Sequence, residues 1–144
     1  MNRPPLQVLV AEDDEDDQIL IAEAFERAGA DVELRFVDDG VAALDALVEY
    51  DARDHGPLVL LDLNMPRMSG HEVLASLREE GPHRRTPVVV LSTSAAAADV
   101  ETSYRLGANA HCVKPDSFAG LTQMMDDLHA FWGRQVELPR RAND

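Results

Sequence analysis

The sequence contains only one cysteine, Cys112, among its 144 residues. An intrachain disulfide is therefore excluded, and a reducing compartment is favoured. No apolar run approaches the ~20 residues that a helix needs to cross a bilayer. Residues 1–7 also lack the basic and then apolar layout of a signal peptide. These absences predict a cytoplasmic protein that folds as one compact domain.

Positive charge is scarce as well. The chain has 13 Lys and Arg against 27 Asp and Glu, which gives a formal net charge of -14 at pH 7. Nucleic acids and anionic membranes need neutralising cations on the proteins that bind them. We therefore expect no binding to nucleic acid or to a membrane. The acids are also unevenly placed, because every residue from 12 to 17 is acidic.

Short apolar segments alternate along the chain with segments of helical period. The apolar segments at 6–11, 32–37, 58–62, 88–91 and 111–113 predict strands, and the stretches between them predict helices, including 41–50, 70–80 and 96–106. Such alternation indicates a parallel sheet with helices on both faces. The second strand alternates apolar and polar residues, as an edge strand can. The sequence therefore predicts an α/β fold: a five-stranded parallel sheet, flavodoxin-like and doubly wound, with strand order 2-1-3-4-5.

One-face spacing within the helices predicts which side chains are buried. In the helix at 41–50 the predicted inner residues are Val41, Leu44, Leu47 and Val48. In the last helix they are Leu121, Met124, Met125 and Leu128. The histidines show no metal-ligand spacing, and four of them are expected at the surface or in loops: His55, His71, His83 and His129.

Acidic residues follow two of the predicted strands. In this strand order ligands bind beyond the carboxyl ends of strands one and three, where Glu12, Asp13 and Asp62 would converge. Three close carboxylates repel unless a cation or protons intervene, and Mg²⁺ prefers such oxygen ligands. Ser92 and Lys114, at the ends of strands four and five, would add a hydroxyl and a positive charge. Together these groups could accept a phosphoryl group.

Five segments resemble the receiver domain of two-component response regulators. They read VAEDD at 10–14, LDLNMP at 61–66, MSG at 68–70, LST at 91–93 and VKP at 113–115, and the resemblance covers about residues 6–132. It implies that Asp62 is the phosphate acceptor, which forms an aspartyl phosphate with a phosphoryl group from a sensor histidine kinase.

The resemblance also implies a role for each neighbouring residue. Asp13 and the backbone carbonyl of Asn64 would ligate Mg²⁺ beside Asp62, and Glu12 would act through a water. Ser92 would hydrogen-bond the phosphoryl group, and Lys114 would pair with it. The Lys114–Pro115 peptide is often cis in this family.

Two positions depart from the common family pattern. Ser92 stands where Thr is more frequent, which keeps the hydroxyl. His111 stands where the family usually has Tyr or Phe, a side chain that moves inward on activation. Ser92 and His111 are therefore the candidate switch residues.

The C-terminal part is similar to the small stand-alone regulators that pair with bacterial phytochrome kinases. This narrower resemblance rests on Phe118, Leu121, residues 128–132 and the segment 136–139. It implies a receiver domain at 1–132 and a tail at 133–144 without an output domain. Surplus apolar residues predict a homodimer through the fourth helix, fifth strand, fifth helix and tail.

Two alternative functions stay open, a phosphohydrolase and a scaffold, whereas a calcium-binding EF-hand does not fit the sequence. An aspartate-nucleophile phosphohydrolase would need a second acid two residues after Asp62, where this chain has Asn64. An EF-hand would need Gly and Glu at loop positions that neither acidic segment supplies. A scaffold that works without phosphorylation would not need Asp62 and the residues around it, so their presence argues against this function. The favoured function is a signalling protein, not a metabolic enzyme, with slow autophosphatase activity at most.

Overall fold

The computed structural model describes residues 3–50, 56–79 and 81–139, and in them five parallel strands form one sheet in the order β2-β1-β3-β4-β5. The strands are β1 (Leu6–Ala11), β2 (Val32–Val37), β3 (Leu58–Leu61), β4 (Val88–Ser92) and β5 (Ala110–Val113). The helices are α1 (Glu15–Arg27), α2 (Gly40–Val48), α3 (Gly70–Arg78), α4 (Ala97–Arg105) and α5 (Phe118–Leu128), followed by a π-helix, η1 (His129–Gln135). The predicted fold class and strand order are confirmed.

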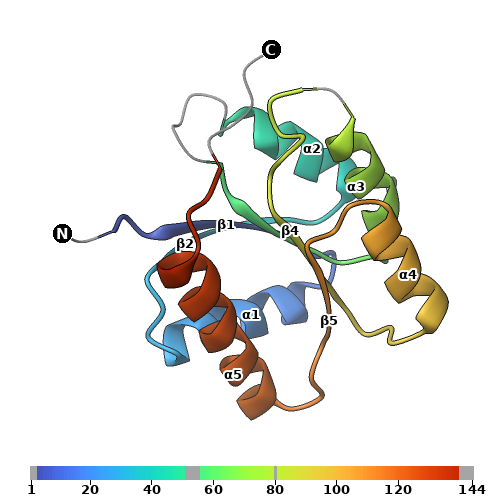
Figure 1. The fold of residues 1–144 in the computed structure, drawn as a ribbon. Coiled ribbons are helices and arrows are strands. Elements are labelled where there is room, and N and C mark those ends of the chain that lie inside the picture. Colours follow the sequence, from blue (N-terminus) through green and yellow to red (C-terminus); the bar gives the residue numbers. More distant parts are fainter. Residues whose placement is uncertain (1–2, 51–55, 80, 140–144) are drawn as a thin grey trace.

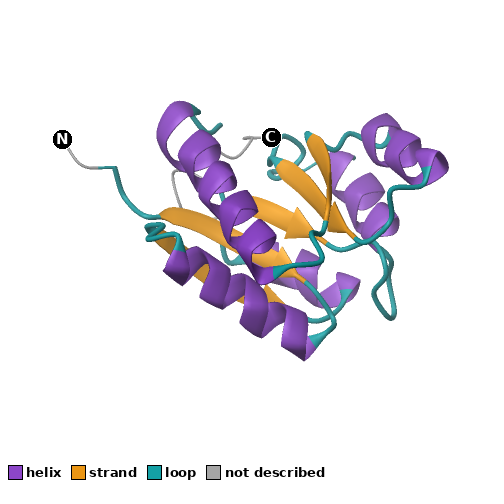
Figure 2. Ribbon diagram, turned by 90° about the horizontal axis from the view of Figure 1, so that it is seen from below, coloured by secondary structure: helices purple, strands orange, loops and turns teal. Residues whose placement is uncertain are grey.

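The sheet lies between two layers of helices (Figures 1 and 2). On one face, strand residues such as Val8, Val10 and Leu60 pack with Phe25 of α1 and Met125 of α5. On the other face, the alternate strand residues pack against α2 and α3. Both faces of β1, β3 and β4 are covered, which is why these strands are apolar without alternation.

The prediction for helix α2 is correct for Leu47, which is buried, and for Leu44, which is partly buried, but wrong for Val41 and Val48. Val41 and Val48 are 37% and 65% exposed, whereas Ala43 and Ala46 are buried. The helix packs closely at its start, where a Cβ on Gly40 would lie 2.2 Å from the carbonyl oxygen of Met68. In α5 the prediction is closer, because Leu121 and Met125 are buried and Met124 and Leu128 pack partly buried against the same core.

Two of the histidines expected at the surface or in loops are buried, although His83 does lie in the loop between α3 and β4. His83 and His129 are 8% and 6% exposed. The ring of His129 lies against Gly133, where a Cβ would come within 2.8 Å of its Cδ2 atom. The missing side chain four residues later thus makes room for the ring. His71 is half-buried, and His55 lies outside the described residues.

The chain after α5 folds back onto its own N-terminal segment. Helix η1 continues through Gln135, past the predicted domain end at Trp132, and Trp132 and Leu138 pack against the core shared by α1 and α5. Arg3 donates a hydrogen bond of 3.0 Å to the carbonyl of Val136 and pairs with Glu137 at 2.8 Å. The described part of the tail therefore contacts its own chain.

In the described ranges, none of the helices combines the length and apolar character that a bilayer span requires.

Candidate functional site

Three carboxylates meet at the carboxyl end of the sheet. Strands β1 and β3 are neighbours with Ala11 opposite Leu61, so the acids that follow them are brought to the same edge. One carboxylate oxygen from each of Glu12, Asp13 and Asp62 lies within 4.8 Å of the others. Glu12 and Asp62 are 2% and 8% exposed, whereas Asp13 is open to solvent. The predicted convergence of these three acids is present.

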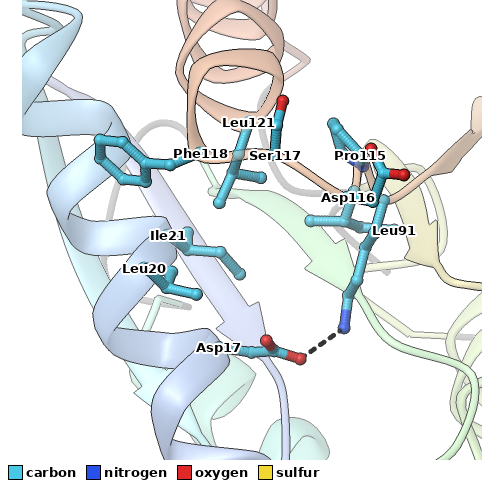
Figure 3. A pocket seen from close by; sticks show the side chains of 10 residues that line it. Asp17, Leu20, Ile21, Leu91, Pro115, Asp116, Ser117, Phe118 and Leu121 are labelled. Carbon is cyan, nitrogen blue, oxygen red and sulfur yellow. Dashed lines mark hydrogen bonds and ion pairs between the residues drawn. The ribbon is translucent and has the colours of Figure 1, made fainter.

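Lys114 supplies the positive charge beside these acids. Strand β5 pairs with β4, and the Lys114 N–H donates a hydrogen bond of 2.8 Å to the carbonyl of Ser92, which holds the residue at the same sheet edge. Its ammonium donates a short hydrogen bond to Oε1 of Glu12. It donates a second one, of 3.2 Å, to Oδ2 of Asp17, which is the dashed line in Figure 3. Asp17 was not among the predicted site residues, because acidic residues such as those at 14–17 are common at the solvent-exposed N-terminus of a helix.

The buried acids have unusual protonation behaviour. Burial raises the pKa of Glu12 to about 7, although its hydrogen bond with Lys114 acts in the opposite direction. Burial also raises the pKa of Asp62, against the charge of Lys114 and a hydrogen bond from the backbone N–H of Asn64. Burial alone would lower the pKa of Lys114, but its contacts with Glu12 and Asp62 outweigh this effect and raise it. The ammonium therefore stays charged at neutral pH.

The loop after Asp62 is held close to it. A Cβ on Gly70 would lie only 2.2 Å from the carbonyl oxygen of Asp62, so this position requires glycine. The Gly70 N–H donates a hydrogen bond of 3.0 Å to Leu63, which closes the loop before α3. Asn64 is exposed within this loop, next to the acids, and its N–H faces the Asp62 carboxylate.

Ser92 and His111 are linked through Ser94. Ser92 is fully buried at the end of β4, and its hydroxyl oxygen accepts a hydrogen bond of 3.1 Å from the Ser94 N–H. The Ser94 carbonyl lies 2.9 Å from Nε2 of His111, which must donate because a carbonyl can only accept. The other ring nitrogen of His111 lies 2.9 Å from the Ser103 hydroxyl, which also contacts His71. Nothing in the sequence spacing marks Ser94, Ser103 or His71 as members of this network.

The Lys114–Pro115 peptide is trans, in contrast to the cis form that the family resemblance implied.

A small apolar hollow adjoins Lys114. It measures about 120 Å³ and lies between α1 and the start of α5 (Figure 3). Leu20, Ile21, Phe118 and Leu121 form its apolar wall. Leu20 is 39% exposed, so part of this wall is open to contact from outside.

The three acids fit a hard divalent cation. They offer carboxylate oxygens at close range, two of them on buried side chains, and the single nearby ammonium cannot neutralise all three. Oxygen ligands of this kind suit Mg²⁺ and Mn²⁺. Residues Glu12, Asp13 and Asp62 would hold such an ion, with the backbone of Asn64 at its edge.

A model of the response regulator receiver domain matches residues 8–126. The chain belongs to this family. It is 36% identical over 141 residues to the response regulator Rcp1 of Synechocystis sp., and the match covers 96% of each chain.

Solved structures of phytochrome-related regulators share this fold. The Mn²⁺-bound form of Rcp1 has a TM-score of 0.81 at 37% identity, over 94% of this chain and 99% of that one. The phosphorylated cyanobacterial phytochrome response regulator RcpA has a TM-score of 0.84 at 35% identity, over 94% and 99%. The regulator RPA3017, in red light signalling of R. palustris, has a TM-score of 0.84 at 37% identity, over 93% and 98%. This receiver domain is thus similar to phytochrome-associated regulators along nearly its whole length.

Proposed function

We propose that this receiver domain accepts a phosphoryl group on Asp62 from a sensor histidine kinase and signals through protein–protein contacts. The observation that carries the proposal is the position of the Asp62 carboxylate. The side chain is almost buried, and one of its oxygens lies within 4.8 Å of a carboxylate oxygen of Glu12 and of Asp13. The positive charge of Lys114 lowers the pKa of Asp62, against the effect of burial. Glu12 is buried in the same cluster, but its two carboxylate oxygens already accept hydrogen bonds from the Lys114 ammonium and the Asp14 N–H.

The transfer itself follows from the chemistry of the groups. A carboxylate oxygen of Asp62 attacks the phosphorus, an O–P bond forms, and the N–P bond to the kinase histidine breaks with its electron pair leaving on the imidazole. Bound Mg²⁺ would supply neutralisation of the charge on the phosphoryl oxygens. The Lys114 ammonium, now shared by Glu12 and Asp17, would pair with one of those oxygens. The hydroxyl of Ser92 would donate to another.

Mg²⁺ is the metal proposed for this site. The relative Rcp1 has been solved with Mn²⁺, which shares the preference for oxygen ligands. Asp13 and Asp62 would bind the ion directly, with the Asn64 carbonyl, and Glu12 would act through a water.

Hydrolysis of the aspartyl phosphate would be slow. A fast phosphohydrolase needs an acid or base beside the nucleophile, and the amide of Asn64 cannot exchange a proton at neutral pH. This difference favours a signalling protein with at most slow autophosphatase activity over a metabolic hydrolase.

The partners follow from the relatives and from the exposed surface. The phytochrome-associated relatives support a bacteriophytochrome-type kinase as the phosphoryl donor, in the cytoplasm. A homodimer through α4, β5 and α5 is supported by exposed apolar side chains on α4 (Tyr104) and β5 (Val113), and by Phe131 in η1, which directly continues α5. Residues 1–132 form the receiver in this proposal, and residues 133–144 form its tail. Its switch residues are Ser92 and His111.

The decisive experiment is phosphorylation with acetyl phosphate and Mg²⁺, followed by intact-protein mass spectrometry. The wild type should gain one labile phosphoryl group, and Asp62→Asn should gain none while staying folded. Asp38→Asn, which removes an exposed acid outside the site, is the matched control and should behave like the wild type. Labelling of Asp62→Asn, or continuous turnover of acetyl phosphate without a phosphorylated species, would refute the proposal.

A further inference from the structure

The loop between β3 and α3 contains a strained turn. Arg67 has φ of 65° and is the only non-glycine residue with positive φ in the described parts of the chain. The Met68 N–H donates a hydrogen bond of 2.7 Å to the carbonyl of Pro66, so Arg67 is the central residue of a three-residue turn. A γ-turn whose central residue has positive φ is rare and strained, and a Cβ makes this conformation unfavourable. Something must hold Arg67 in place.

That support comes from Asp39. One guanidinium nitrogen of Arg67 donates to both carboxylate oxygens of Asp39, at 3.0 and 2.9 Å. Asp39 is itself fixed, because it is the N-cap of α2 and accepts a hydrogen bond of 2.7 Å from the Ala42 N–H. The strained turn is therefore tied to the end of a helix that packs on the sheet.

The same loop forms one wall of the acidic site. Gly40, next to Asp39, packs so closely that a Cβ would lie 2.2 Å from the Met68 carbonyl oxygen. At its other end, Gly70 packs equally closely on the carbonyl of Asp62. Between these contacts the backbone N–H of Asn64 hydrogen-bonds the Asp62 carboxylate. A shift of the Arg67 turn would therefore move Asn64 relative to the acids.

We propose that Asp39 and Arg67 are positioning residues, whose ion pair holds the β3–α3 loop so that the Asn64 backbone faces the metal and phosphoryl site. The inference rests on the function proposed above. The Arg67 side chain is 60% exposed and that of Asp39 is 14% exposed, so solvent screens the pair from the arginine side and its contribution to stability should be modest. Its effect should instead fall on the site, because residues that support a metal ligand typically change metal affinity by about 10- to 100-fold.

The test compares two variants and a control. Asp39→Asn keeps an oxygen that can cap α2 but removes the charge, and Arg67→Gly removes the guanidinium while relieving the turn. Arg35→Gln is the control, since it breaks an exposed ion pair with Glu49 at the other end of α2. For each protein we would measure Mg²⁺ affinity by calorimetry, the rate of labelling by acetyl phosphate, and the unfolding temperature in chelator.

We expect Mg²⁺ binding to weaken about tenfold in Asp39→Asn and in Arg67→Gly, with slower labelling. The double variant should bind no more weakly than either single variant, because both remove the same contact. In chelator, Arg67→Gly should unfold at or above the wild-type temperature because glycine tolerates positive φ. The control should match the wild type throughout.

Three results would overturn the inference. One is wild-type Mg²⁺ affinity in both variants. Another is a loss of Mg²⁺ affinity that is accompanied by a clear fall of the unfolding temperature in chelator, because this would indicate a purely structural role. A wild type that binds no Mg²⁺ and takes up no phosphoryl group would instead refute the proposed function, and the positioning role with it.

Discussion

The ammonium of Lys114 hydrogen-bonds a carboxylate oxygen of Glu12, a residue 102 positions earlier in the chain. Both side chains are almost enclosed, at 13% and 3% exposure. Glu12 has no comparable partner for its negative charge among the described residues, and it also faces Asp62. The protonation of Glu12 should therefore influence the stability of the whole domain.

Without metal, the free energy of unfolding should fall as pH rises from about 4.5 to about 7. The pKa of Glu12 lies near 7 in the folded chain against 4.5 as its ordinary value, and that of Asp62 is also raised. The folded state then binds more protons than the unfolded state in this range, so deprotonation favours unfolding. Urea unfolding in chelator at pH 5 and pH 7.5 measures this slope, and Glu12→Gln should flatten it. A wild type that becomes more stable over this range would contradict the expectation. Added Mg²⁺ should stabilise more at the higher pH, because its ligands must be deprotonated.

Asp62→Asn should raise stability in chelator by about 1 kcal/mol. The substitution removes repulsion with Glu12 and Asp13, and the lost attraction to Lys114 offsets part of that gain. Saturating Mg²⁺ should raise the unfolding temperature of the wild type more than that of the variant, because the variant has lost a ligand. Paired thermal melts with chelator and with Mg²⁺ give both values. Equal metal-induced shifts in the two proteins would show that Asp62 is not a ligand.

The proposed homodimer should depend on Phe131. This side chain is 54% exposed, and its ring meets Trp132 edge-on at 5.3 Å between centroids. In a twofold-symmetric dimer both subunits carry the substitution Phe131→Ser at the interface, so the variant should be a monomer. Light scattering at tens of micromolar, with and without beryllofluoride, measures the mass. Val48→Ser, on the exposed side of α2, is the control and should leave the mass unchanged. A monomeric wild type in both states would rule out the dimer.

Phosphorylated protein should not bind DNA. The net charge of -14 opposes approach to a polyanion, and few cations are available to replace its counterions. Fluorescence anisotropy with duplex DNA at low salt, in the presence of beryllofluoride, should show no change. Saturable retention of one sequence would mean that the output includes direct DNA recognition.

The sequence was sufficient to predict the sheet and the three converging acids, because both depend on local patterns. Continuous apolar runs mark the covered strands, and Asp13 and Asp62 follow two strands that become neighbours. The close packing of α2 through Gly40 on Met68 could not be predicted in this way, because the two residues meet only in the folded chain. The positive φ of Arg67 could not be predicted from the sequence either, because the contact that accompanies it is with Asp39, 28 positions earlier in the chain.

Other details depend on single distant contacts. His129 is buried, and Gly133 leaves space for its ring. The spacing of the histidines in the sequence argues against a metal site, but it does not indicate whether a histidine is buried. Ser94 joins His111 to Ser92 through its backbone carbonyl and its backbone N–H. No side-chain pattern encodes such links.

The strand order also determines when the site is completed during synthesis. Strand β1 takes its place between β2 and β3, so Glu12, Asp13 and Asp62 can meet once the first half of the chain has emerged from the ribosome. Lys114 follows β5, and at typical elongation rates it is made about 3 to 10 s after Asp62. During that interval the nascent chain carries the three acids without their ammonium partner. Until Lys114 is made, only protons or a bound cation can relieve the repulsion between these acids when β1 pairs with β3.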